Sequence, residues 1–144
     1  VTYTERIRRL GSEDPALVAA DGSLSLTQGH VVALAERDRA RYDVTYESRT
    51  ACTEPVNSVW SVTELIVAST AGAVTVVTAV PDGNVTDLLA DEWVTHAFVS
   101  AACAQALDVA DLEDLEVLVL TDGAQPEARP DVRRVVADAE VWSA

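Results

Sequence analysis

The sequence has no lysine and no methionine, a single phenylalanine, two histidines and two cysteines. Its ten basic residues are therefore all arginines, and they face 24 acidic residues, for a formal net charge of −14. Nucleic-acid grooves and anionic membrane surfaces both need clustered cations, so this charge argues against either partner. Cys52 and Cys103 lie in unrelated contexts with no spacing code. The sequence therefore indicates neither a disulfide framework nor a zinc module.

Long hydrophobic runs are missing as well. The first residues are polar and charged and lack the apolar core of a signal peptide, which favours a cytoplasmic location. The longest uncharged stretch, residues 65–81, contains several hydroxyl side chains and breaks at Gly72. A membrane span needs about 20 consecutive apolar residues. We therefore expect a soluble chain without membrane contact.

The sequence instead alternates apolar strands with short helices. Its 144 residues are about one average domain, so we expect a single domain over residues 1–144. Strands are expected at residues 43–47, 74–79, 95–100, 117–120 and 140–143. Helices are expected at residues 59–71, 84–89, 101–107 and 130–136. Strands that are apolar on both faces and separated by helices predict an α/β fold, a mostly parallel sheet with helices on both faces.

A different pattern precedes these repeats. Two short apolar runs flank Asp21 and Gly22, which together form a favoured hairpin turn. Thr27 then has the side chain of a helix cap, and apolar residues on one helical face follow it. The pattern predicts an N-terminal β-hairpin and helix over residues 14–42, followed by βα repeats over residues 43–144.

Several short phrases occur in order along the chain. The first, EDPALVAADGSLSLT, covers residues 13–27, and NSVW then opens the helix that leads into AGAVTVV. The remaining phrases, EWVTHAFV, LEDLEVLVL and EVWSA, occupy residues 92–99, 112–120 and 140–144. In this order and spacing, the phrases resemble the N-terminal core of adenylation domains in the superfamily of nonribosomal peptide synthetases and acyl-CoA synthetases. The resemblance implies a trimmed version of their large N-terminal subdomain.

The resemblance also identifies what this sequence leaves out. Between Tyr42 and Pro55 the family carries a long insertion that includes its Ser/Thr/Gly-rich phosphate loop. The family's carboxylate for the substrate amine falls on Val56, its YGPTE motif would follow Ala144, and its catalytic lysine has no counterpart. ATP phosphates need backbone N–H groups and a cation. We therefore expect no catalytic, cofactor-binding or metal-binding residues and no cofactor.

These losses predict a catalytically inactive structural subdomain. The resemblance supplies a context, because modules of depsipeptide synthetases carry truncated adenylation-like subdomains beside a ketoreductase. The implied partners are neighbouring adenylation, ketoreductase and carrier domains, which the chain would position. Two alternatives stay open: a free-standing acidic α/β binding protein with a pocket near Ser100 or Thr121, or a small enzyme that uses Cys103 or His96.

The histidines and cysteines are the remaining candidates for chemistry. His96 is interpreted as a packed, hydrogen-bonded strand residue rather than a general base, and His30 as a surface residue. Neither has an acidic residue at a recognisable metal-ligand spacing. Cys103 lies near a helix N-terminus, where a thiol pKa can fall, although the small residues around it favour packing. Cys52 is expected in a loop, exposed and without a partner.

Acidic and aromatic residues complete the candidates. The acidic stretch between Asp108 and Glu116 is interpreted as a solvated connection rather than a metal or partner patch. Trp60 and Trp93 stand at apolar positions of the resembled family and are expected in the core. Trp142, near the end of the last expected strand, is a candidate for contact with another domain.

Overall fold

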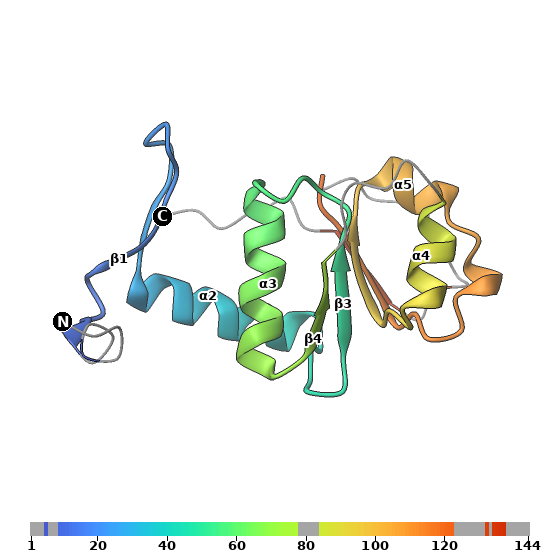
Figure 1. Cartoon of the computed structure of the whole chain (residues 1–144), viewed down its shortest axis with the longest axis horizontal. Coiled ribbons are helices and arrows are strands. Elements are labelled where there is room, and N and C mark those ends of the chain that lie inside the picture. The colour runs from blue at the N-terminus through green and yellow to red at the C-terminus, as the bar shows by residue number, and fades with distance from the viewer. Residues whose placement is uncertain (1–4, 6–8, 78–83, 123–131, 133, 138–144) are drawn as a thin grey trace.

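The computed structural model describes residues 5, 9–77, 84–122, 132 and 134–137. The strands of its main sheet are β3 (Arg49–Cys52), β4 (Val74–Val76), β5 (His96–Val99), β6 (Val117–Leu120) and β7 (Arg134–Ala137). The helices are α2 (Gln28–Arg41), α3 (Val59–Ala71), α4 (Val85–Asp91), α5 (Ala101–Ala106) and the short 3-10 helix η1 (Val109–Asp111). Helices α2 and α3 lie on one side of the sheet, and α4 and α5 lie on the other (Figure 1).

The main sheet is doubly wound. Its strands are all parallel, in the order β4-β3-β5-β6-β7. The chain leaves β3 for β4 on one side and then crosses back to β5 on the other, which makes a switch point between β3 and β5. In such sheets, ligands bind outside the carboxyl ends of the strands at the switch point. The α/β class and the parallel sheet predicted from the sequence are confirmed, and so are the helices on both faces.

Alternating side chains of the two central strands build a core on each face of the sheet. One set packs on the side of α4 and α5, namely Ala97, Val99, Leu118 and Leu120. The intervening set faces α2 and α3, namely His96, Phe98, Val117 and Val119. All of these residues are buried. Burial on both faces explains why these strands read as continuous apolar runs.

Helices α2, α3, α4 and α5 each begin at a side chain that accepts a hydrogen bond from a backbone N–H of the first turn. The capping residues are Thr27, Ser58, Asn84 and Ser100, and the donor–acceptor distances run from 2.9 to 3.2 Å. Helix α3 ends at Gly72, which has a left-handed φ of 72°. The helices predicted from Thr27, over residues 59–71, from Asn84 and over residues 101–107 are thus confirmed, within a residue or two at their ends.

The N-terminal hairpin forms a sheet of its own. Strands β1 (Pro15–Val18) and β2 (Ser25–Thr27) pair antiparallel, around a turn in which Gly22 has a φ of 75°. Leu26 is completely buried, and Leu17 and Leu24 pack on the same core cluster as residues of α2 and α3. The predicted hairpin is confirmed, and its apolar side chains contact the helices rather than extend the main sheet.

The first strand of the main sheet lies later in the chain than predicted. The strand expected over residues 43–47 is wrong, because this stretch forms the link into β3. Asp43 has a φ of 56°, and the N–H of Thr45 donates to Ser48 Oγ at 2.9 Å, which is turn geometry. The valine, threonine and tyrosine residues of the link have a high propensity for β-strands. The residues that pair with β4 and β5, however, are Arg49–Cys52. Pairing partners therefore override local propensity.

The helix predicted over residues 130–136 is also wrong, because Arg134–Ala137 form β7. Val135 and Val136 lie opposite Leu118 and Val119 of β6, and the two valines join the cores on opposite faces of the sheet. Consecutive β-branched residues suit a strand that is buried on both sides. The strand expected at residues 140–143 lies outside the described residues.

Candidate functional site

The carboxyl edge of the sheet at the switch point is occupied by the chain's own polar groups. The hydroxyl of Thr121, after β6, donates to Glu54 Oε1 at 2.6 Å, so Glu54 reaches across the end of β5. The N–H of Ala101 donates to Asp122 Oδ2 at 3.0 Å, and Ser100 Oγ accepts from Cys103 N. A pocket near Ser100 or Thr121 was one expectation for a binding protein. The hydroxyl groups of Ser100 and Thr121 both form hydrogen bonds within the chain.

His96 is completely buried in β5, on the face covered by α2. Its Nε2 lies 2.9 Å from the Tyr42 carbonyl and its Nδ1 lies 2.8 Å from Thr95 Oγ1. A carbonyl oxygen only accepts, so Nε2 carries the proton, and Nδ1 of the neutral ring accepts from the threonine hydroxyl. Burial lowers the pKa of His96 and favours this neutral form. Both ring nitrogens are engaged within the fold, as the sequence interpretation expected.

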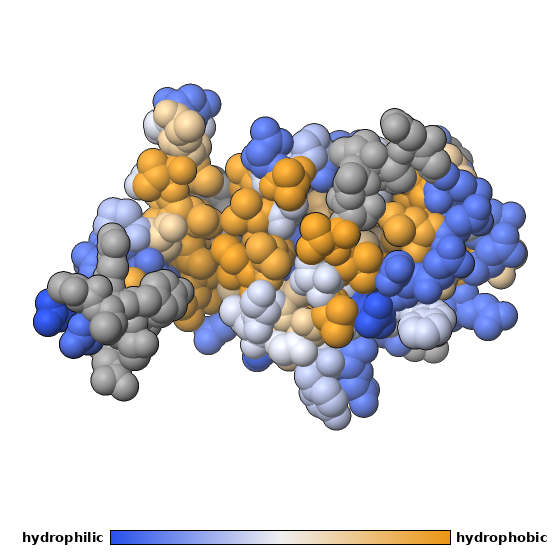
Figure 2. Space-filling model, in the orientation of Figure 1, coloured by the Kyte–Doolittle hydropathy of each residue, from blue (hydrophilic) through white to orange (hydrophobic). Residues whose placement is uncertain are grey.

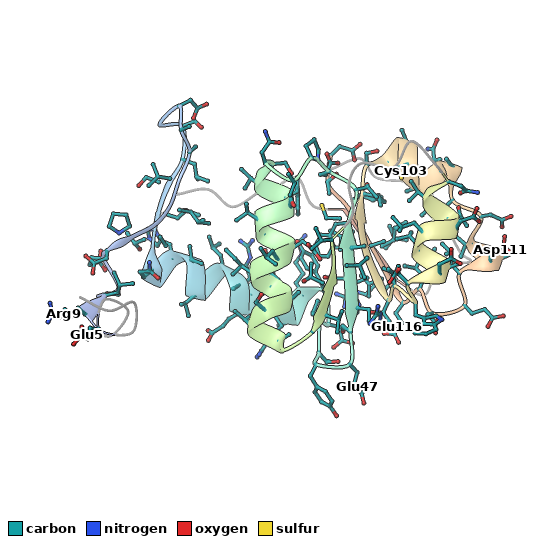
Figure 3. The ribbon with its side chains drawn as sticks, in the orientation of Figure 1. Glu5, Arg9, Glu47, Cys103, Asp111 and Glu116 are labelled. Carbon is teal, nitrogen blue, oxygen red and sulfur yellow. The ribbon has the colours of Figure 1, made fainter. Side chains whose placement is uncertain are left out.

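The two cysteines are free thiols near the carboxyl edge, and neither has the environment of a nucleophile. Cys103 lies on α5 (Figure 3), and burial raises its pKa, although Thr53 and the helix N-terminus are close. The expectation that Cys52 lies in an exposed loop is wrong. Cys52 is the last residue of β3 and is buried, and this burial raises its pKa to about 12. Thiolates are the reactive form, so both environments suppress reactivity.

The tryptophans divide between the core and the surface. Trp60 is buried among the residues of α2 and α3, as expected. The expectation that Trp93 lies in the core is wrong, because 65% of its surface is exposed. Trp93 follows α4 in a left-handed conformation with a φ of 51°, and the guanidinium carbon of Arg49 lies 5.9 Å from its ring centroid. Trp142 lies outside the described residues.

Several acidic residues lie in the connection from α5 to β6, and those that the structure describes form no metal site. Asp111 lies on η1, and Glu116 lies at the amino end of β6 (Figure 3). Across the described parts of the chain, no group of three His, Cys, Asp or Glu residues is placed to hold a metal ion. His30 is exposed at the start of α2. Among the helices of these same parts, none is long and apolar enough to cross a membrane.

Apolar side chains gather on one face, over the hairpin, α3 and the edge strand β4 (Figure 2). We define the apolar surface as Leu17, Val18, Leu24, Val56, Val59, Val62, Leu65, Val76 and Val77. They line two adjoining hollows that share Val62, one against the hairpin and one against β4. Val18, Leu65 and Val77 are 66%, 49% and 79% exposed. The opposite end of the molecule, around η1, is hydrophilic (Figure 2).

Helix α3 carries no charge on its solvent face. Its single charged residue is Glu64, and Glu64 is only 3% exposed. A surface helix of a globular protein normally opposes an apolar face to a charged one. The exposed positions of α3 are instead Leu65 and the uncharged Ser69 and Thr70. The outer face of α3 thus has the composition of a contact surface.

The hollow against β4 is a cavity of about 210 Å³ between α3 and the carboxyl ends of β3 and β4. Glu64 and Cys52 line it, together with apolar side chains of α3 and β4. The Thr50 hydroxyl hydrogen-bonds Glu64 Oε1, and burial raises the pKa of this carboxyl group. Sequence reasoning missed Glu64. The available signal was its place one helical turn after Trp60, on the face that meets the core.

Three solved structures show what this fold resembles. The complex of VinN with L-aspartate is 18% identical over 91% of this chain and 41% of that chain, with a TM-score of 0.74. A Mycobacterium tuberculosis fatty acyl CoA synthetase is 19% identical over 86% and 29% of the two chains, with a TM-score of 0.71. The nonribosomal peptide synthetase FmoA3 is 22% identical over 77% and 13%, with a TM-score of 0.64. No protein-family model and no curated protein matches the sequence.

These likenesses establish the fold. The implied resemblance to an adenylation-type subdomain is confirmed at that level, since the matches include a nonribosomal peptide synthetase and an acyl-CoA synthetase. The chain spans only 13% to 41% of the length of these three proteins. In fold, it therefore corresponds to a part of each of these proteins.

Proposed function

We propose that this chain is a catalytically inactive, adenylation-like subdomain of a nonribosomal peptide or depsipeptide synthetase, and that it positions neighbouring domains. The adenylation core, a ketoreductase and a carrier domain are the partners that the proposal names. A cytoplasmic location, where thiols stay reduced, belongs to the same proposal and agrees with two free cysteines.

The observation that carries the proposal is the apolar surface. Interdomain contacts bury moderate areas with apolar centres and polar rims, and they fix orientation without chemistry. The uncharged outer face of α3, the hairpin and the edge of β4 form one continuous apolar area on a chain whose formal charge is −14. Large exposed apolar areas of this kind mark interaction sites.

The link between α2 and β3 supports the absence of adenylation chemistry. This link runs from Tyr42 to Ser48 as a short turn, where the resembled family places its phosphate loop. The sequence has no lysine to offset phosphate charge. FmoA3 has been solved in an AMPPNP-bound form, but that property belongs to FmoA3 and is not carried over to this chain.

The test of the proposal is a binding experiment with the domains encoded in the same reading frame. Leu65→Glu and Val18→Glu place a charge on the apolar surface at exposed positions, so the fold should persist. We expect each variant to lower co-purification with the adenylation or ketoreductase partner at least tenfold, because a buried unpaired charge is costly at an interface.

The matched control is Tyr46→Glu, which charges a side chain that is 75% exposed, in the link that precedes β3 and outside the apolar surface. This variant should bind its partner as the parent chain does. Two results contradict the proposal: a reading frame that encodes no synthetase domain, and partner binding that survives both charged variants. The first result would favour a free-standing acidic binding protein.

A further inference from the structure

The cavity between α3 and β4 contains a buried acid whose second oxygen has no partner. Within the described residues, the Thr50 hydroxyl is the only hydrogen-bond partner of the Glu64 carboxyl group, and it contacts Oε1. Oε2 has none, and it is not among the described side-chain atoms that are both fully buried and unpartnered, so it borders the accessible space of the cavity. An oxygen in this position is open to a hydrogen bond from a ligand in the cavity.

The walls of the cavity select for an apolar chain. Val62 and Leu65 of α3 line one side of the cavity, and Val76 of β4 and the following Val77 line the other. The volume of the cavity is about 210 Å³. A water molecule occupies roughly 30 Å³ in the liquid, so the space holds a small organic group as well as a polar head. None of the described residues that line the cavity is basic.

We propose that this cavity binds a small primary alkylammonium ligand, with the ammonium group paired to Glu64 and the alkyl chain against Val62, Leu65 and Val76. An ammonium group donates three hydrogen bonds, and one of them can reach Oε2. A cation is favoured over an anion because the carboxyl group of Glu64 can carry only a negative charge, none of the described lining residues is basic, and the whole chain is acidic. Glu54 also lines the cavity, but it is only partly buried, so its carboxylate keeps contact with solvent, and its Oε1 already accepts a hydrogen bond from Thr121.

Binding is expected to release a proton. Burial raises the pKa of Glu64 and favours its neutral form in the empty cavity. A bound ammonium group stabilises the ionised form, so the carboxyl proton leaves to solvent as the ion pair forms. The apparent affinity should therefore rise with pH, by up to tenfold per unit, until Glu64 is ionised without the ligand.

The experiment is calorimetric titration of the isolated chain with n-pentylammonium, in phosphate rather than an amine buffer. 1-Pentanol and pentanoate are the matched neutral and anionic probes. We expect n-pentylammonium to bind at least tenfold more tightly than either, and to bind more tightly at pH 8 than at pH 6. Glu64→Gln keeps the shape of the side chain and should weaken binding of n-pentylammonium at least tenfold.

A second variant keeps the test valid if Glu64→Gln disturbs the fold. Val62→Phe fills the cavity while leaving the acid in place, and it should abolish binding of n-pentylammonium. Three results overturn the proposal: equal affinity for 1-pentanol, binding that is unchanged in Glu64→Gln, and no binding to the parent chain at millimolar concentration. The titration uses no neighbouring domain, so its failure is distinct from a failure of the scaffold function.

Discussion

At the residue scale, the buried polar side chains differ in how many hydrogen-bond partners they have. His96 has two partners and Glu64 has one, whereas Thr63 on α3 has a buried hydroxyl without any partner among the described residues. An unsatisfied buried hydroxyl costs about 1–3 kcal/mol. These polar groups are therefore the most informative single residues to change.

Thr63→Val should raise the free energy of unfolding by about 1 kcal/mol, because valine has the same shape and needs no hydrogen bond. Urea denaturation measures this difference. Thr70→Val on the same helix is the matched control, since the Thr70 hydroxyl donates to the Val67 carbonyl at 2.8 Å. The control should be neutral or slightly destabilising, and a destabilised Thr63→Val would contradict the prediction.

Glu64 should also give the protein a measurable pH dependence. Its pKa in the folded protein is raised above the ordinary 4.5, so its favourable contribution is complete below pH 4.5 and is lost as pH rises through the folded pKa. Glu64→Gln has no such loss, so its stability relative to the parent chain should increase from pH 4.5 upward and level off once Glu64 of the folded parent chain is ionised. Denaturation curves of both proteins at several pH values test this, and parallel pH profiles would refute it.

At the scale of elements, the termini of helices and turns were the easiest parts to predict. Thr27 and Asn84 cap helices and Gly72 ends one, as their residue types indicate. The errors fall where tertiary pairing decides: β3 lies beyond the strand-like link after α2, and β7 replaces a predicted helix. Val135 and Val136 fit either pattern, and only their alignment with β6 selects the strand.

The candidate site was harder to predict than the fold. Cys52 and Trp93 were misplaced because their exposure depends on neighbours that are distant in sequence. Trp93 occupies a left-handed position after α4 where glycine is usual, which no local pattern indicated. The sequence pattern does not single out Glu64, because an acidic residue on a helix normally faces solvent.

Gly72→Ala should destabilise the protein by about 1 kcal/mol, because alanine resists the left-handed conformation that ends α3. A Cβ atom there would lie 3.7 Å from Tyr46 Cβ, an ordinary contact, so the cost is one of backbone conformation. Gly11→Ala is the control. Its φ is not left-handed and its Cβ would also meet only an ordinary contact, so its stability should change little. Thermal melting of both variants measures the difference.

At the scale of the whole molecule, the proposed inactivity has a direct consequence for nucleotide binding. The purified chain should show no ATP-dependent pyrophosphate exchange and no rise in melting temperature with ATP and magnesium. A ligand at 100 times its Kd stabilises a protein by about 2.7 kcal/mol, which is readily seen in a melt. A reproducible shift of several degrees with ATP would contradict the inactive assignment.

The strand order also bears on how the chain assembles during synthesis. The first strand of the main sheet to be made, β3, lies inside that sheet, and β5, β6 and β7 follow one another outward from it in the order in which the ribosome releases them. Each new strand can thus join an edge that already exists, and none has to insert between two paired neighbours. Because chains fold from the N-terminal end as they emerge, this arrangement suits co-translational folding and limits how long any apolar edge stays unpaired.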